Sequence, residues 1–357
     1  MEPLDLVGRL APDAPGGAVL LDGGTATELE RDGHDLSDAL WSARLLLDAP
    51  ESVTAVHRRF LDAGAEVVTT ASYQLAAASL AAAGRGREQA DVLLARSVAV
   101  ARAAVDAAVA DGWTTRDGRR PLVAASIGPY GAVLADGSEY RGGYGLGEDE
   151  LVAFHAPRVA ALVDAGADVL AVETVPSALE LAALARVLAG VAVPVYASVT
   201  LGPDGRTTAE GQPLASAFAP LLALDEVVAV GVNCCPPPLV LPALRALAHC
   251  SRPLVAKPNV GRRWDAAARR WVARDDAADT TGAPRRVDDD GAEHAVSDGA
   301  FGYGADRDGR DAPGDPSAPR HAADPAAWVA AGARLVGGCC GTGPQHLRRL
   351  AGRIDRR

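Results

Sequence analysis

The sequence contains few aromatic residues and almost no lysine. Phe, Trp and Tyr together make up 4% of its 357 residues, whereas hydrophobic residues make up 48%. A core of this composition must be built mainly from Ala, Val and Leu. The basic residues are almost all arginine, and Lys257 is the only lysine. We interpret this bias as a property of genome composition, so the rarity of lysine is not in itself a sign of function.

Several patterns that would indicate other classes of protein are also missing. The net charge is −11 and no stripe of Lys and Arg provides a basic face, which argues against nucleic-acid binding. Residues 1–17 lack the basic start and apolar run of a signal peptide. No window reaches roughly 18 uninterrupted apolar residues, the length that a membrane span requires. We therefore expect a cytoplasmic protein that binds neither nucleic acid nor a membrane.

The cysteines are few, but four of the five stand in two adjacent pairs. Neighbouring cysteines rarely form a disulfide bond with each other, because the required geometry strains the single peptide unit between them. In a chain without an export signal, such cysteines are more often metal ligands or free thiols. The alternative is that they are small buried hydrophobic residues.

Short apolar, β-branched runs alternate along the chain with longer segments of helical spacing. The predicted strands are residues 18–21, 66–70, 122–126, 169–172, 193–199, 227–232, 254–256 and 334–336. The predicted helices include residues 50–63, 91–109, 148–165, 178–188, 214–222 and 239–248. Several helical segments end in Ala-Gly-Ala, where glycine suits a left-handed cap before the next strand. Eight such units predict a (β/α)8 TIM barrel, with residues 1–357 forming one domain.

Residues 273–323 do not follow this alternation of predicted strands and helices. They are rich in Asp, Gly, Arg and Pro and lack periodic apolar residues, so we predict a long flexible insertion after the seventh strand. A disordered surface loop is the simpler interpretation, and a lid over the site is the other.

In a barrel of this kind, functional groups gather at the carboxyl ends of the strands. The two cysteine pairs, Cys234-Cys235 and Cys339-Cys340, follow the sixth and eighth predicted strands. Three thiolates from these two loops could hold Zn²⁺ and leave its fourth position open, as in catalytic zinc sites. Glycines flanking Cys339 would allow the tight turn that brings successive residues to one ion.

The segments around these cysteines are Gly231-Val232-Asn233-Cys234 and Gly337-Gly338-Cys339-Cys340. They resemble the homocysteine S-methyltransferase family, whose members share a barrel, a Gly-x-Asn-Cys segment and a Gly-Gly-Cys-Cys segment. Further resemblance lies in residues 21–30, 40–43, 70–74, 126–131, 136–142 and 172–176. It spans residues 20–350, except for the insertion.

The resemblance implies roles for individual residues. It places zinc on Cys234, Cys339 and Cys340, and it leaves Cys235 outside the pattern. Asp22 and Glu173, each at a strand end, would hold the ammonium group of homocysteine. The alternatives are a turn-forming Asp before two glycines and a carboxylate at a helix start.

Other polar and aromatic residues at the strand ends are less specific. Asn233 would orient the zinc ligands or the substrate carboxylate, although a turn residue is an equal alternative. Tyr73 and Gln74, together with Tyr140 and Trp41, would line the pocket of the methyl donor, because aromatic faces attract cations. Packing in the core accounts for each of them nearly as well.

The sequence departs from the family pattern at Lys257-Pro258-Asn259, where we would expect an aromatic residue before Pro-Asn. A lysine at a barrel strand end also suggests a Schiff-base aldolase. That function would leave both cysteine pairs unexplained, and a zinc-binding protein without catalytic activity is a further alternative.

The resemblance points most closely to members that use S-methylmethionine. We therefore expect zinc-dependent methyl transfer from a sulfonium, S-methylmethionine first and S-adenosylmethionine second, to homocysteine, with methionine as product. Betaine or a folate is the alternative donor. We expect a monomer or a weak homo-oligomer.

Overall fold

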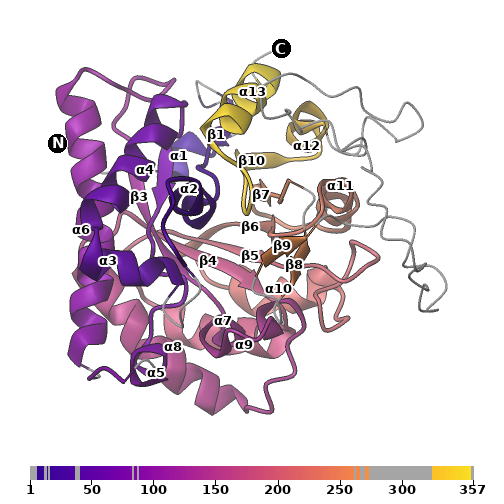
Figure 1. Cartoon of the computed structure of the whole chain (residues 1–357). Helices are drawn as coiled ribbons and strands as arrows, with labels where there is room; N and C mark the ends of the chain where they lie inside the picture. Colours follow the sequence, from indigo (N-terminus) through magenta and orange to yellow (C-terminus); the bar gives the residue numbers. More distant parts are fainter. Residues whose placement is uncertain are drawn as a thin grey trace, which may run out of the picture.

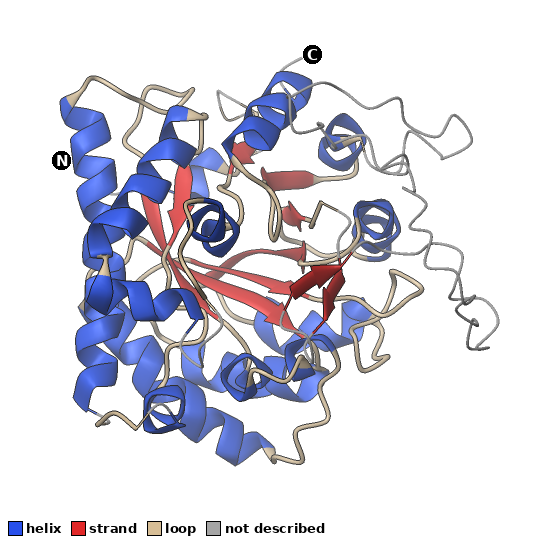
Figure 2. Ribbon diagram, in the orientation of Figure 1, coloured by secondary structure: helices blue, strands red, loops and turns tan. Residues whose placement is uncertain are grey.

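The computed structural model has eight parallel strands at its centre and helices around them (Figures 1 and 2). The residues that it describes are 6–11, 14, 17–36, 41–82, 84–86, 88–260, 263–265, 270–272 and 324–354. The predicted insertion at residues 273–323 lies outside the described residues.

The strands follow one another around the sheet in chain order. They are β1 (Val19–Leu20), β2 (Val67–Thr69), β3 (Leu122–Ile127), β4 (Val169–Val175), β5 (Val195–Val199), β6 (Val227–Asn233), β7 (Leu254–Lys257) and β10 (Ala333–Val336). A parallel bridge between Leu21 and Val67 joins the two ends of the sheet. The hydrogen bond from Glu66 N to Leu20 O, 2.7 Å long, supports the same junction. The predicted (β/α)8 barrel is therefore confirmed.

Helices cover the outside of the strands (Figure 2). The longer ones are α4 (Pro50–Asp62), α6 (Glu88–Ala110), α8 (Glu148–Asp164), α9 (Ala178–Leu188), α10 (Leu214–Leu222), α11 (Pro237–Ala246) and α13 (Pro344–Ile354). The short ones are α1 (Leu6–Arg9), α2 (Thr25–Arg31), η1 (Trp41–Arg44), α3 (Leu45–Asp48), α5 (Ala77–Ala82), α7 (Tyr130–Leu134), η2 (Ser138–Tyr140) and α12 (Pro325–Ala330). Helices α9 and α10 have the bounds predicted from the sequence. Among the described residues, no helix has both the length and the apolar character needed to cross a bilayer.

A two-stranded antiparallel hairpin, β8 (Arg263–Asp265) and β9 (Arg270–Val272), stands outside the barrel sheet. The sequence analysis did not predict it.

Alternating strand residues divide the core into two layers, because successive side chains of a strand point to opposite faces. Val19, Leu122 and Tyr196 belong to the cluster inside the barrel. Leu20, Val123 and Val195 belong to the larger cluster between the strands and the helices. Small and β-branched side chains fill both layers, as expected from the shortage of aromatic residues.

Helix α1 closes the end of the barrel at which the strands begin. Its Leu6 packs with the interior cluster, as does Leu10 directly after it. Arg9 donates a 2.6 Å hydrogen bond to the carbonyl of Arg120, which precedes β3. Functional groups can therefore be reached only from the opposite end, where the strands finish.

The predicted glycine caps are present. Gly64, Gly166 and Gly332 have φ values of 103°, 81° and 103° and stand between a helix and the strand that follows it. These are left-handed conformations that a side chain would strain.

Candidate metal centre and substrate pocket

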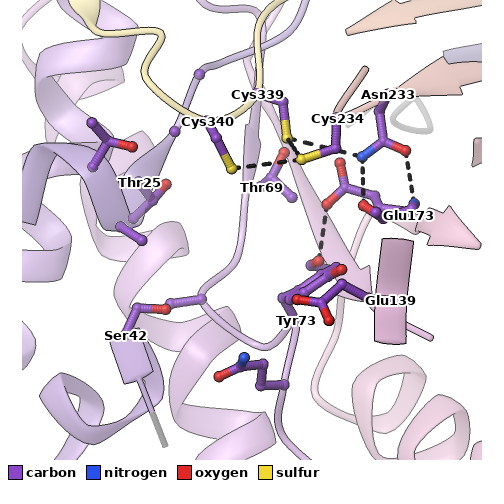
Figure 3. Close-up of a pocket in the computed structure, with 18 of the residues that line it drawn as sticks. Thr25, Ser42, Thr69, Tyr73, Glu139, Glu173, Asn233, Cys234, Cys339 and Cys340 are labelled. Atoms are coloured by element: carbon purple, nitrogen blue, oxygen red, sulfur yellow. Dashed lines mark hydrogen bonds between the residues drawn. The ribbon is translucent and has the colours of Figure 1, made fainter. Parts of the chain in front are cut away.

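Three cysteine sulfurs meet at the carboxyl end of the barrel. Cys234 follows β6, and Cys339 and Cys340 follow β10. Sγ of Cys234 lies 3.2 Å from that of Cys339 and 3.6 Å from that of Cys340. All three sulfurs lie within 4.8 Å of one another and point toward a common space (Figure 3). The structure thus brings together the three cysteines that the sequence analysis selected.

This cluster fits a metal ion by distance and by charge. Tetrahedral thiolate ligands about 2.3 Å from one zinc ion lie about 3.8 Å apart, close to the separations found here. Hydrogen bonds from the thiols of Cys234 and Cys340 lower the pKa of Cys339 well below its usual range. Three thiolates at this separation would repel one another strongly, and a divalent cation would compensate their charge. The cluster therefore suits a soft divalent metal.

Two loops that pack closely against their neighbours hold the cysteines. Cys234 has a φ of 50°, and its N donates to the carbonyl of Lys257 over 3.1 Å. The N of Cys339 donates to the carbonyl of Pro258 over 2.8 Å. A Cβ on Gly337 would lie 2.7 Å from Cβ of Leu21, so glycine is required there by close packing. The left-handed glycine of this loop is Gly341, which follows Cys340 and has a φ of 80°.

The remaining two cysteines lie outside the cluster. Cys235 is 1% exposed and packs in the outer core, and burial raises the pKa of its thiol. Sγ of Cys250 lies 3.4 Å from the carbonyl oxygen of Arg252. Neither thiol joins the group of three sulfurs.

Asn233 connects the ends of β4 and β6. Its Oδ1 accepts hydrogen bonds from Thr174 N at 2.7 Å and from Ser198 Oγ at 2.8 Å, and its Nδ2 donates to Thr174 Oγ1 at 2.8 Å. These bonds hold Thr174 at a φ of 63°, a rare conformation for a β-branched residue. Nδ2 also lies 4.0 Å from Sγ of Cys339. The geometry therefore favours ligand orientation for Asn233.

Glu173 and Asp22 share a buried cation, Lys257. Its Nζ lies 2.7 Å from Glu173 Oε1 and 3.5 Å from Asp22 Oδ1. Ser126 Oγ donates to the other oxygen of Glu173 over 3.0 Å. Burial alone would lower the pKa of Lys257, but Glu173 and Asp22 together raise it well above its usual range.

The two acids differ in their access to the pocket. Glu173 lines it, as does Lys257, whereas Asp22 is 0% exposed and is not among the lining residues. Both oxygens of Asp22 accept hydrogen bonds from Thr69, one from its N at 2.6 Å and one from its Oγ1 at 2.8 Å. Burial raises the pKa of Asp22 to about 6, against the opposing effects of Lys257 and Thr69. Of the two predicted ammonium-binding acids, Glu173 lines the pocket and Asp22 lies behind it.

The paired state of Lys257 argues against Schiff-base chemistry. An amine must be unprotonated to attack a carbonyl carbon, and the pKa of this one is raised well above its usual range. The ammonium group is 3% exposed and is held between two carboxylates.

One pocket contains the cysteine cluster and most of the predicted substrate residues. It encloses about 1120 Å³ of empty space, part of which is open to solvent. Tyr73, Gln74 and Tyr140 line it, and the hydroxyl of Tyr140 lies 3.4 Å from Sγ of Cys234. The side chain of Trp41 lies outside the described residues. The sequence analysis did not select Glu139, which also lines the pocket; its only signal was a place in a family-like segment.

Comparisons with known proteins agree with this architecture. The family model described as homocysteine S-methyltransferase matches residues 19–354. A homocysteine S-methyltransferase of Escherichia coli is 39% identical over 339 residues, which cover 94% of each chain. The homocysteine S-methyltransferase YbgG of Bacillus subtilis is 37% identical over 339 residues, which cover 93% of each chain. A selenocysteine Se-methyltransferase of Brassica oleracea is 37% identical over 349 residues, which cover 95% of this chain and 89% of that one.

Solved structures of a homocysteine methyltransferase are similar to this chain as well. The oxidised form of the homocysteine methyltransferase MmuM of E. coli superposes with a TM-score of 0.76 at 36% identity, covering 98% of this chain and 100% of that one. Its metallated form gives a TM-score of 0.73 at 37% identity, covering 94% and 96%. The chain therefore belongs to the homocysteine S-methyltransferase family and is a methyltransferase.

Proposed function

We propose that this enzyme transfers a methyl group from a sulfonium donor to homocysteine, with zinc held by Cys234, Cys339 and Cys340, and releases methionine. One observation carries the proposal. Three cysteine sulfurs within 4.8 Å of one another share a pocket with a carboxylate that can receive an ammonium group. The E. coli relative has been solved in a metallated form, which supports the binding of a metal by this enzyme.

Zinc bound there would lower the pKa of a substrate thiol and keep its sulfur as a thiolate. The side chains of the pocket would supply alignment, because Glu173 can hold the ammonium group of homocysteine beside the cysteine cluster. Asn233 would orient Cys339 from behind, since its Nδ2 lies 4.0 Å from that sulfur. The bond between the donor sulfur and its methyl group breaks as the homocysteine sulfur bonds to that methyl. The donor keeps the electron pair, and the thiol proton is released to solvent.

The charges of the pocket favour a cationic donor. Among the described lining residues, Lys257 is the only cation, and the carboxylate of Glu173 neutralises it at 2.7 Å. The rings of Tyr73 and Tyr140 offer faces that attract a sulfonium. A sulfonium leaves as a neutral thioether, so charge is dispersed during transfer and no acid has to protonate the leaving group.

The identity of the donor can be tested with a panel. We expect kcat/KM with homocysteine to be highest for S-methylmethionine, next for S-adenosylmethionine, and lower by at least about 100-fold for betaine and methyltetrahydrofolate, a difference of about 2.7 kcal/mol. Zinc-loaded enzyme and equal homocysteine should be used throughout. If betaine or the folate is the best donor, the sulfonium assignment is wrong although zinc and homocysteine can still be correct.

Homocysteine recognition gives a second test. Loss of a hydrogen bond to a charged group costs about 1.5–3 kcal/mol, so Glu173→Gln should raise the KM for homocysteine at least tenfold. The glutamine oxygen can still accept a hydrogen bond from Lys257, which protects the fold. Asp149→Asn, on the exposed surface of α8, is a matched control and should leave this KM unchanged. An unaltered KM in Glu173→Gln at full zinc content would show that Glu173 does not bind the substrate.

A cytoplasmic location and a monomeric or weakly associated state are consistent with this function and stay predictions.

A further inference from the structure

A second carboxylate in the pocket has no role in the proposed chemistry. Glu139 is 7% exposed, lines the pocket, and belongs to η2, after β3. Its Oε2 has no hydrogen-bond partner among the described residues. An ionised carboxylate is costly to bury without a partner, so an unpaired carboxylate in the wall of a pocket indicates a ligand that completes it.

The nearest cation of the same loop does not supply that partner. The guanidinium of Arg141 is largely exposed and lies 3.8 Å from the carboxylate of Asp136. Burial raises the pKa of Glu139 to about 7, and the effect of Arg141 is too small to reverse this. Among the described residues, no basic side chain forms an ion pair with this carboxylate, which leaves room for a cationic group of a ligand.

The loop holds Glu139 in a fixed place. A Cβ on Gly131 would lie 2.5 Å from the N of Glu139, so glycine lets η2 rest directly on α7. Ala135 and Gly137 take left-handed conformations, with φ values of 54° and 81°. Ser138 N donates to Asp136 Oδ1 over 2.9 Å. This packing places Glu139 in the wall of the pocket.

The position of Glu139 separates it from the homocysteine end of the pocket. In Figure 3, Glu173 is drawn next to the cysteine sulfurs, whereas Glu139 is drawn beside Tyr73, on the far side of Glu173 from the sulfurs. Tyr140 follows Glu139 directly in the chain, and its hydroxyl lies 3.4 Å from Sγ of Cys234. Tyr73 and Tyr140 both line the same pocket as Glu139 and the cysteines.

We propose that Glu139 binds the α-ammonium group of an amino-acid methyl donor, while the sulfonium of that donor lies against Tyr73 and Tyr140. An ammonium suits this position better than a sulfonium, because it can donate charge-assisted hydrogen bonds to Oε2. The two amino acids would then be held by different acids, homocysteine by Glu173 and the donor by Glu139. This inference rests on the proposed function and adds how the donor is selected.

The experiment combines a variant with a shortened donor. The donors are S-methylmethionine and 4-(dimethylsulfonio)butanoate, which differ only in the α-ammonium group. Glu139→Gln should lower kcat/KM for S-methylmethionine about 10- to 100-fold and change that for the butanoate less than about threefold. The KM for homocysteine should not change. Calorimetric binding of both donors to zinc-loaded wild type and variant should show the same pattern, whether or not transfer is fast enough to follow.

Asp136→Asn is the matched control, since it removes a negative charge from the same loop but keeps the oxygen that accepts from Ser138 N. It should change donor use less than about threefold, as expected for an exposed charge. Glu139→Asp keeps a carboxylate on a shorter side chain. Its kcat/KM for S-methylmethionine should lie between those of wild type and Glu139→Gln. Equal losses for both donors, or a change in homocysteine KM alone, would overturn the inference and leave the proposed function intact. Failure of wild type to methylate homocysteine from any sulfonium would contradict the proposed function instead.

Discussion

Cys339→Ser is expected to remove bound zinc and to reduce methyl transfer to homocysteine at least about 1,000-fold, an increase of about 4 kcal/mol in the activation barrier. Serine has nearly the size of cysteine, but its hydroxyl is a poor ligand for zinc at neutral pH. The two remaining sulfurs, of Cys234 and Cys340, lie 3.6 Å apart and would no longer enclose the ion. Zinc per chain and transfer rate should be measured on the same preparations.

Two cysteines of the same chain serve as controls for this series. Cys234→Ser and Cys340→Ser should behave like Cys339→Ser, whereas Cys235→Ser and Cys250→Ser should keep about one zinc per chain and most of the activity. Cys235 is the stricter control, because it follows Cys234 directly and yet faces the core. Full zinc content in Cys339→Ser, or loss of zinc in Cys235→Ser, would contradict the assigned ligands.

Lys257→Met is expected to lower the free energy of unfolding by about 3–5 kcal/mol at pH 8, the usual effect of removing one partner from a buried ion pair. Methionine fills a similar volume but leaves Asp22 and Glu173 buried without their cation. The comparison should be made by urea unfolding of reduced, metal-free protein, so that release of zinc at low pH does not interfere.

The loss of unfolding free energy in Lys257→Met should become smaller at acidic pH. The pKa of Asp22 in the folded enzyme is about 6 and is lowered by Lys257, so removal of the lysine raises it further. An acid whose folded pKa is raised contributes stability below its unfolded pKa, and that contribution is lost as pH rises through the folded value. The free energy of unfolding of Lys257→Met should therefore approach that of wild type toward pH 5. The difference between the two should be largest at pH 8.

Arg186→Met provides the contrasting case. Arg186 makes ion pairs of 2.9 and 2.8 Å with Glu148 and Asp149, but half of its side chain is exposed. Exposed pairs contribute only about 0–1 kcal/mol, so this variant should remain close to wild type. If Lys257→Met loses no more stability than Arg186→Met, the buried network around Lys257 does not contribute as inferred.

The barrel and the cysteine cluster could be predicted from the sequence because both depend on local order along the chain. A helix followed by a buried strand recurs along the chain, in several cases with a glycine cap between them, and parallel strands bring their carboxyl ends to one rim. Residues that follow β6 and β10 must therefore be close together. The distances among Cys234, Cys339 and Cys340 agree with that reasoning.

The difference between the two predicted acids could not be predicted in the same way. Asp22 and Glu173 both stand at strand ends, but Thr69 holds both oxygens of Asp22 and Lys257 lies between it and Glu173. These contacts join residues far apart in the chain, so no local pattern reveals them. Glu139 was not selected from the sequence for a similar reason, since only the folded pocket shows that its Oε2 has no hydrogen-bond partner among the described residues. The hairpin β8–β9 was missed because each strand has three residues, too few for a periodic signal.

The burial of Lys257 also determines how this enzyme meets amine-reactive reagents. The chain has one lysine, and its side chain is 4% exposed between two carboxylates. Acylating dyes and cross-linkers attack unprotonated, accessible amines, so Lys257 of the folded enzyme should remain unlabelled. A label found on Lys257 would mark molecules whose barrel opened during the exposure, which gives a covalent record of how often the core becomes accessible.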